Sequence, residues 1–315
     1  MNQTKKLTDG AMMTVMYLVL LVASFFIPYL AFVIYFLLPV PFIIYAYRYD
    51  WKPAIIMFAA AAILASLFAT VFSLPMTITT ALGGVMIGTA MHRKTPGFET
   101  LARGTVGFVI GLLMAFMFVQ TISGVNFSKE FDQVLEESIS NAQQFAGKMG
   151  GASSEMDKQL DLLKQQFEAF KLLVPAMLVI VGLFYAWISQ LLGYKIINRV
   201  ERKQFRFPPF RQMRFPVAIV WIYFFALVIT LFGPGKQTIL YIGVQNVLFL
   251  AGTLMVLQGL SFVFFYAHEK KMPKALPIIV IILTVFFSTL LLPLVRILGI
   301  IDIGFNLRNM MEKKK

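Results

Sequence analysis

The sequence predicts an all-α fold, a polytopic transmembrane helical bundle of about nine spans (eight to ten) with a helical hairpin outside the membrane. Three observations support this prediction. Hydrophobic residues make up 59% of the chain and charged residues 14%, with a mean hydropathy of +0.78, whereas soluble domains carry about 25% charged residues. Apolar runs recur at the length of roughly 20 residues that crosses a bilayer. The alternating pattern of membrane β-strands is absent, so these runs must be helices.

Nine apolar runs have the required length, at 10–27, 29–47, 53–73, 76–91, 99–123, 171–193, 215–232, 238–267 and 275–292. The first run follows a charged N-terminus, as in a signal peptide. It continues past Pro28 into a second span without a small-residue cleavage site, which indicates an uncleaved first helix. The runs divide the chain into a membrane half over 1–125, an extracytoplasmic hairpin over 126–170 and a second membrane half over 171–315.

Short basic loops predict the orientation, because Lys and Arg concentrate in cytoplasmic loops. Basic residues fall at alternate ends of successive spans, in the segments 5–6, 48–52, 93–94, 195–214 and 270–274. The N-terminus is therefore expected in the cytoplasm. Pro293 is expected to end the ninth helix and to let 294–305 return as a partial span, which would place the basic C-terminus in the cytoplasm as well.

The segment 126–170 is the only long region of polar character between spans. It holds eight acidic and four basic residues. Its apolar residues recur at spacings of three and four on both sides of Gly150 and Gly151, which predicts two amphipathic helices joined at the glycines. Two interpretations remain open. The hairpin is a lid packed on its own bundle, or it covers an outward-facing cavity or contacts an extracellular partner.

The stretch NRVERKQFRFPPFRQMRF at 198–215 interleaves basic and aromatic residues. Such interleaving occurs in single-strand nucleic-acid binders, but it is equally expected where a chain lies on anionic lipid headgroups. Since membrane topology accounts for the basic excess, no nucleic-acid partner is expected. The candidate contacts for headgroups or a cytoplasmic partner are Arg199, Arg202, Lys203, Arg206, Arg211 and Arg214.

Uncharged polar residues inside the spans offer a second candidate site. A single Ser, Thr, Asn or Gln in a membrane helix most often bonds its own backbone or joins two helices. Five such residues fall together in the outer halves of their helices, where a small polar or amphipathic molecule could bind. These candidate substrate-binding residues are Gln120, Ser123, Asn126, Gln245 and Asn246.

Small residues four apart mark three consecutive helices. Such spacing lets helix backbones approach closely. Packing within the bundle is one interpretation, and a docking surface for another membrane subunit is the other. The residues concerned are Ala61, Ala65, Ala69, Gly84, Gly88, Gly107 and Gly111.

Charged residues at membrane depth are functional candidates by default, but few occur. Glu99 and Arg103 are four apart near a helix start, which favours an interfacial pair. Asp302 is expected to pair with Arg296 or Arg308 in the C-terminal tail.

No catalytic apparatus is evident. The chain has no cysteine, and its two histidines, His92 and His268, fall at helix ends. The HExxH, GxSxG and P-loop spacings are absent. The sequence therefore predicts a protein that is not an enzyme and that holds no metal or cofactor.

The N-terminal half resembles a known family. The stretch LTDGAMMTVMYLVLLVASFFIPYLAFVIYFLLPVPFIIYAYRYDWKPAI and, further on, LGGVMIGTAMHRKTP are similar to the YybS-like group of uncharacterised bacterial membrane proteins. The tail GIIDIGFNLR, with Gly299, Asp302 and Arg308, resembles the C-terminal end of that group. The group in turn is distantly similar, chiefly over residues 7–125, to the S components of energy-coupling-factor vitamin importers.

S components are usually six-helix proteins that capture a vitamin or metal ion from outside and associate with a membrane coupling subunit and two ATPases. Many carry an AxxxA-type motif on their first helix, whereas here that spacing lies on the third helix, at Ala61, Ala65 and Ala69. The resemblance implies a substrate-capture or transport protein in the bacterial cytoplasmic membrane, with a small-molecule ligand and those partners. The residues leave a second hypothesis open, a membrane scaffold or regulator that recruits an enzyme through 195–214.

Overall fold

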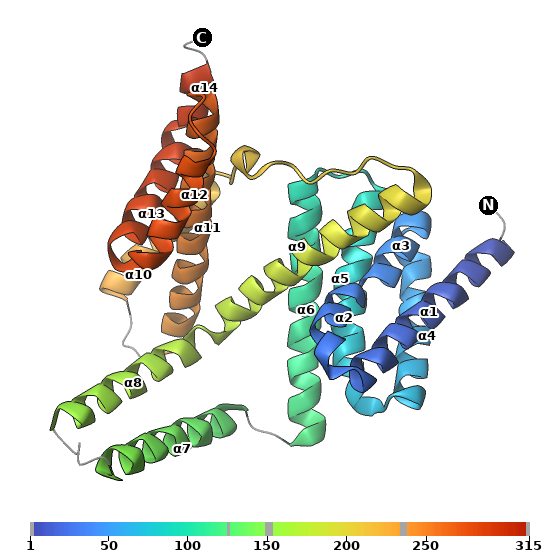
Figure 1. Cartoon of the computed structure of the whole chain (residues 1–315), viewed down its shortest axis with the longest axis horizontal. Coiled ribbons are helices and arrows are strands. Elements are labelled where there is room, and N and C mark those ends of the chain that lie inside the picture. The colour runs from blue at the N-terminus through green and yellow to red at the C-terminus, as the bar shows by residue number, and fades with distance from the viewer. Residues whose placement is uncertain (1–2, 125–126, 149–153, 234–237, 313–315) are drawn as a thin grey trace. The chain divides into compact units, whose positions relative to one another are not determined.

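The structure is a computed structural model that describes residues 3–124, 127–148, 154–233 and 238–312. These residues form fourteen α-helices and two short 3-10 helices, and they contain no strand (Figure 1). Eight helical segments among them are long and apolar enough to cross a membrane, and two shorter apolar helices accompany them. The predicted polytopic helical bundle is therefore confirmed.

The chain folds as two compact units. The N-terminal unit comprises Met1–Glu168 and Met177–Phe207, and the C-terminal unit comprises Ala169–Ala176 and Pro208–Lys315. The helix that opens the predicted second membrane half thus groups, over most of its length, with the first half. The predicted domain boundaries at 125 and 170 remain predictions, and the two units are described separately below.

Six of the eight candidate spans lie in the N-terminal unit. The second of them is broken into two helices at Leu38 and Pro39, where the LPVP sequence supplies two residues without an amide donor. The elements are α1 (Gln3–Phe26), α2 (Pro28–Leu37), α3 (Val40–Tyr49), α4 (Trp51–Phe68), η1 (Val71–Ser73), α5 (Leu74–His92), α6 (Gly97–Ser123) and most of α9 (Val174–Glu201).

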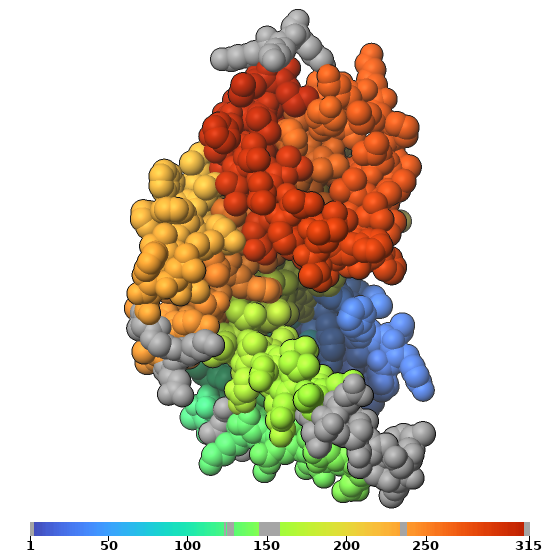
Figure 2. All heavy atoms as spheres, turned by 90° about the vertical axis from the view of Figure 1, so that its left-hand side faces the viewer, coloured from blue at the N-terminus to red at the C-terminus, as the bar shows by residue number. Residues whose placement is uncertain are grey.

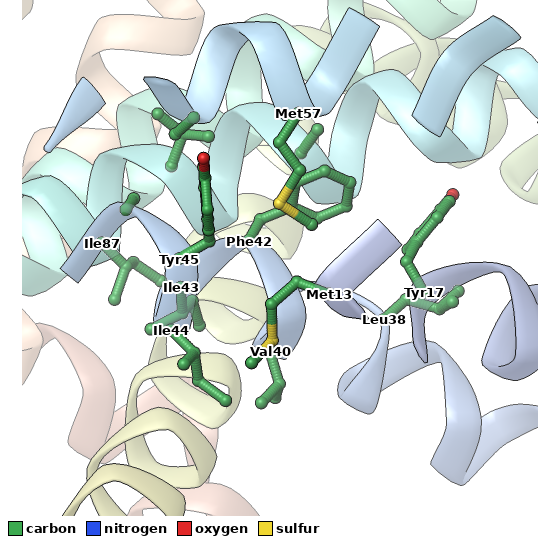
Figure 3. Close-up of a cluster of buried hydrophobic side chains, with 14 of the residues drawn as sticks. Met13, Tyr17, Leu38, Val40, Phe42, Ile43, Ile44, Tyr45, Met57 and Ile87 are labelled. Atoms are coloured by element: carbon green, nitrogen blue, oxygen red, sulfur yellow. The ribbon is translucent and has the colours of Figure 1, made fainter. Parts of the chain in front are cut away.

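The core of this unit surrounds α3, in which every residue of 40–46 is buried. Figure 3 shows side chains of α3 within this cluster, together with Met13, Tyr17 and Met57 from α1 and α4. Helix α5 crosses α3 at very short range, since a Cβ added to Gly84 would lie 2.7 Å from the carbonyl oxygen of Pro39. The small residues of α5 therefore permit backbone contact inside the bundle.

The other small residues of the predicted strip also lie at helix contacts within the unit. A Cβ at Gly107 of α6 would lie 2.7 Å from the carbonyl oxygen of Leu82, and one at Gly111 would lie 2.6 Å from the Cα of Thr79. Ala61 and Ala65 of α4 are fully buried, and Ala69 is half-buried. Docking of another subunit on this strip is therefore not needed to account for the spacing.

The predicted hairpin consists of α7 (Phe127–Lys148) and α8 (Ser154–Leu172). Leu135 and Ile139 of α7 form a buried cluster with Leu160 of α8. Gly150 and Gly151, the predicted break, lie outside the described residues. Val134 and Leu163 remain exposed, so the hairpin buries only part of its apolar surface in itself. Whether it serves as a lid or as a partner site remains a prediction.

The C-terminal unit contains η2 (Phe210–Gln212), α10 (Ala218–Phe232), α11 (Ile239–Glu269), α12 (Ala275–Phe286), α13 (Ser288–Phe305) and α14 (Leu307–Glu312). Figure 2 shows one face of this unit, on which α13, in red, lies between α10 and α12. Helices α11 and α13 pack backbone to backbone, because a Cβ at Gly299 would collide with the carbonyl oxygen of Met255.

The expectation that Pro293 ends a helix is wrong. Helix α12 ends at Phe286, the chain bends at Phe287 (φ −109°, ψ 44°), and α13 then runs through Pro293. A proline in the second turn removes one backbone hydrogen bond, which a membrane helix tolerates when its neighbours and local adjustments satisfy the freed carbonyl. The last span is therefore a full helix of 18 residues rather than a partial one.

Helix α14 lies beside the basic loop within the C-terminal unit. Arg308 donates a hydrogen bond of 2.7 Å from Nη1 to the carbonyl oxygen of Arg211. Arg214 donates from Nη1 to Oδ1 of Asn309 at 2.9 Å. Within this unit the end of α13 and the loop before α10 thus lie at one end of the bundle. That this end faces the cytoplasm remains a prediction.

Candidate functional site at the basic end of the N-terminal unit

A cavity of about 830 Å³ opens in the N-terminal unit where α1 begins and where α3, α5 and α9 end. All the loops that contribute to it belong to the set predicted to face the cytoplasm. Four basic and two acidic side chains line it together with polar and aromatic ones. The lining residues are Lys5, Asp9, Tyr47, Arg48, Tyr49, Met91, His92, Lys94, Glu201, Lys203, Gln204 and Phe205.

Arg48, in the last turn of α3, organises the charges of the cavity. Its Nη1 lies 3.1 Å from Oδ2 of Asp9, and its Nε donates to Oε1 of Glu201 at 2.6 Å. The hydroxyl of Tyr49 donates to the same Asp9 oxygen at 2.7 Å. The guanidinium therefore joins three helices, and its charge also suits the negative end of the α3 dipole.

The segment after α9 forms one wall of the cavity. The side chain of Asn198 accepts from the backbone amide of Phe205 at 2.7 Å and donates to its carbonyl oxygen at 2.8 Å. The ring of Phe205 stacks on Tyr194, with centroids 5.3 Å apart, and meets Tyr47 edge-on at 5.6 Å. Phe207 packs edge-on against Phe98 in the same manner.

Phe205 and Phe207 thus pack against the N-terminal unit, whereas the basic side chains next to them are exposed, while Arg211 further along is half-buried. Arg199, Arg202, Lys203 and Arg206 are all exposed. In the C-terminal unit, Phe210 packs against Phe264. Stacking of these rings on nucleotide bases would require them to leave their packing, which removes the feature that suggested single-strand binding.

The cavity has a net positive lining. Both of its acidic side chains are engaged by Arg48. Lys5, Lys94 and Lys203 are exposed, and among the residues described none of the three forms an ion pair. The cavity is therefore suited to an anionic group, which lysines can approach as flexible point charges.

The part of the chain that is described does not test whether the five outer polar residues form one site. Gln120 is exposed and Gln245 is half-buried. The side chain of Ser123 and the whole of Asn126 lie outside the described residues. Gln120 and Gln245 belong to different units. None of the five lines the cavity at the basic end of the N-terminal unit or the cavity between Arg211 and His268 in the C-terminal unit, so their joint role in binding remains a prediction.

Asn246 has a structural task that the sequence did not reveal. It is buried, and its Nδ2 donates to the carbonyl oxygen of Leu172 at 2.6 Å, while its Oδ1 accepts from the amide of Ala176 at 2.8 Å. The side chain therefore satisfies the backbone where α8 ends and α9 begins. Only the proline at 175 hinted at this interruption in the sequence.

The model of one protein family, described as "Predicted membrane protein (DUF2232)", matches residues 15–303. The chain belongs to the DUF2232 family. A relative in Bacillus subtilis (strain 168), named "Uncharacterized protein YybS", is 28% identical over 309 residues, which cover 98% of this chain and 99% of the relative. No solved structure matches the chain. Membership of the DUF2232 family confirms the YybS-like resemblance and establishes an integral membrane protein in contact with lipid.

Proposed function

We propose that this protein captures or transports a small molecule in the bacterial cytoplasmic membrane, in the manner of an S component. The N-terminal unit carries the proposal. It contains six segments of spanning length, which is the helix number usual in S components. In the predicted division only five spans fell into this half, and α9 supplies the sixth.

The basic end of the N-terminal unit is the proposed docking face for a membrane coupling subunit and its ATPases. Four exposed basic side chains project there from an ordered segment, and that segment is held by Asn198 and by the packing of Phe205 and Phe207. Basic side chains on a fixed backbone suit an acidic protein surface, because complementary charge steers association and sets orientation. In this proposal the end faces the cytoplasm and the chain itself is not an enzyme.

Mass spectrometry of proteins and small molecules that co-purify from native membranes in mild detergent tests the proposal. We expect a coupling subunit with ATPases, or one defined small molecule, to be retained. A variant with Arg199→Gln, Arg202→Gln, Lys203→Gln and Arg206→Gln should lose the subunit and keep the small molecule. The control neutralises Lys270, Lys271 and Lys274 in the C-terminal unit and should lose neither. Retention of neither class by the unaltered protein contradicts the proposal.

The second candidate is a membrane scaffold or regulator that recruits an enzyme through the basic loop. The observation that favours it is the same separation of inward rings and outward basic side chains, which needs no captured ligand. In this case an enzyme that is not an ATPase should co-purify with the protein, and no small molecule should do so. The variant with four Gln substitutions should lose that enzyme. The two candidates are thus distinguished by one preparation.

A further inference from the structure

Arg296 is a charged residue in the interior of a candidate span. It lies eight residues after the start of α13 and nine before its end. Its Nη1 donates to the hydroxyl of Tyr223 on α10 at 3.2 Å, and its Cζ lies 5.8 Å from the centroid of that ring. Its Nε is buried and has no hydrogen-bond partner. A charge in this environment is costly and calls for a counter-ion.

Arg308, in the same unit, is an arginine whose guanidinium has both an acidic partner and hydrogen-bond acceptors. Its guanidinium is 2.9 Å from Asp302, 3.1 Å from Oγ of Ser261 and 2.7 Å from the carbonyl oxygen of Arg211. Both charged side chains of this pair are 2% exposed. Arg296 has no acidic partner anywhere in the part of the chain that is described. In the described part of the C-terminal unit, Asp302 therefore neutralises Arg308, and no acidic side chain neutralises Arg296.

The spans contain no spare carboxylate for Arg296. Of the fifteen acidic residues, eight belong to the hairpin segment 126–170, and Asp302 is engaged by Arg308. The remaining six fall at or near helix ends, namely Asp9, Asp50, Glu99, Glu201, Glu269 and Glu312. The counter-ion must therefore come from outside the spans of this chain.

The Arg296 side chain is half-buried, and among the described residues only its Nη1 forms a hydrogen bond. Gly252 of α11 makes room for it, since a Cβ there would lie 3.2 Å from Cζ. The Tyr223 oxygen accepts from Arg296, so its own hydrogen is available for donation. We propose that Arg296 and Tyr223 form a binding site for the carboxylate or phosphate group of a ligand within the membrane-embedded C-terminal unit. Guanidinium groups bind such oxyanions in a forked geometry that ammonium groups lack.

The ligand is the headgroup of an anionic lipid or a free anionic solute, and one experiment separates the two sources. The full-length protein is delipidated in dodecyl maltoside, whose headgroup carries neither a carboxylate nor a phosphate, and phosphatidylglycerol, dodecanoate or inorganic phosphate is then added. Native mass spectrometry and the midpoint of thermal unfolding report binding. We expect at least one probe to bind, with affinity about tenfold or more lower in Arg296→Gln. Response to phosphatidylglycerol alone identifies a lipid, and response to either of the others identifies a solute.

Two further variants serve as controls for the loss of charge and for the loss of the guanidinium. Arg103→Gln removes the same charge from an exposed pair with Glu99 and should bind like the unaltered protein. Arg296→Lys keeps the charge but loses the fork, and it should fall between the unaltered protein and Arg296→Gln. Equal binding by the unaltered protein and Arg296→Gln overturns the proposal. The absence of any bound probe also overturns it. A crosslinker placed at position 296 that captures an acidic helix of another protein would overturn it as well.

Discussion

Asp302 and Arg308 form a buried ion pair across the end of α13, with 2.9 Å between the carboxylate and the guanidinium. The chain between them turns at Asn306, which adopts a left-handed conformation (φ 51°, ψ 47°) that asparagine tolerates well. Gln258 of α11 donates to the same carboxylate oxygen at 2.5 Å, and its own oxygen accepts from the amide of Phe215. One carboxylate therefore ties α11, the tail and the basic loop together within the C-terminal unit.

Removing one partner of this pair should destabilise the protein strongly. Asp302→Asn leaves the buried charge of Arg308 without its anion, which costs about 3–5 kcal/mol. Denaturant unfolding of the purified chain in detergent should show the loss. Arg103→Gln, which breaks an exposed pair between residues four apart, should cost at most about 0.5 kcal/mol. Equal losses in the two variants would contradict the account.

The close contact of α11 and α13 predicts that Gly299 tolerates no side chain. Gly299→Ala should lower stability by about 1–3 kcal/mol or more, because the added methyl group collides with the backbone of Met255. Gly304→Ala on the same helix is the matched control, since no atom lies within 4 Å of its added Cβ. The control should gain up to about 1 kcal/mol from helix propensity. The midpoints of thermal unfolding in detergent would show which of the two variants is less stable.

Asn246→Ala distinguishes a structural from a binding role for this predicted substrate residue. The substitution leaves the carbonyl of Leu172 and the amide of Ala176 without their partner, and each buried unsatisfied group costs about 1–3 kcal/mol. The midpoint of thermal unfolding should therefore fall clearly. The neighbouring Gln245 is half-buried, and Gln245→Ala should change the midpoint little. Unchanged stability of Asn246→Ala with loss of a co-purified molecule would support binding instead.

Arg48→Gln should open the basic end of the N-terminal unit. It removes two hydrogen bonds to carboxylates, and the half-buried site suggests a loss of about 1–3 kcal/mol. Hydrogen exchange should rise at the start of α1 and the end of α9, where Asp9 and Glu201 reside. Arg93→Gln, whose nearest acid is 3.8 Å away and which is 49% exposed, should leave exchange unchanged.

The sequence predicted the spans well, because bilayer length and apolarity act on contiguous residues. It failed where the outcome depends on distant contacts. Proline at 293 is a strong local signal for a helix end, yet the bend occurs at Phe287, which carries no such signal. Helix propensity and proline rules give way when neighbouring helices satisfy the backbone.

The candidate site was predictable only in part. The basic residues of 195–214 are evident in the sequence, but the inward packing of Phe205 and Phe207 is not, because either orientation fits the same alternation. Arg48 and Glu201 are separated by 153 positions, and no periodicity connects them. The pairing of Asp302 with Arg308 rather than Arg296 likewise depended on the turn at Asn306.

The bend at Phe287 also bears on bilayer thickness. Helix α12 has 12 residues and α10 has 15, lengths of about 18 and 22 Å, whereas a typical hydrocarbon core measures about 30 Å. The Phe287 amide donates to the carbonyl oxygen of Leu283 and its own carbonyl accepts from Leu291, so Phe287 itself exposes no unpaired backbone group to the hydrocarbon. We therefore expect acyl chains to compress where α10 and α12 face lipid, and we expect the C-terminal unit to favour thin bilayers.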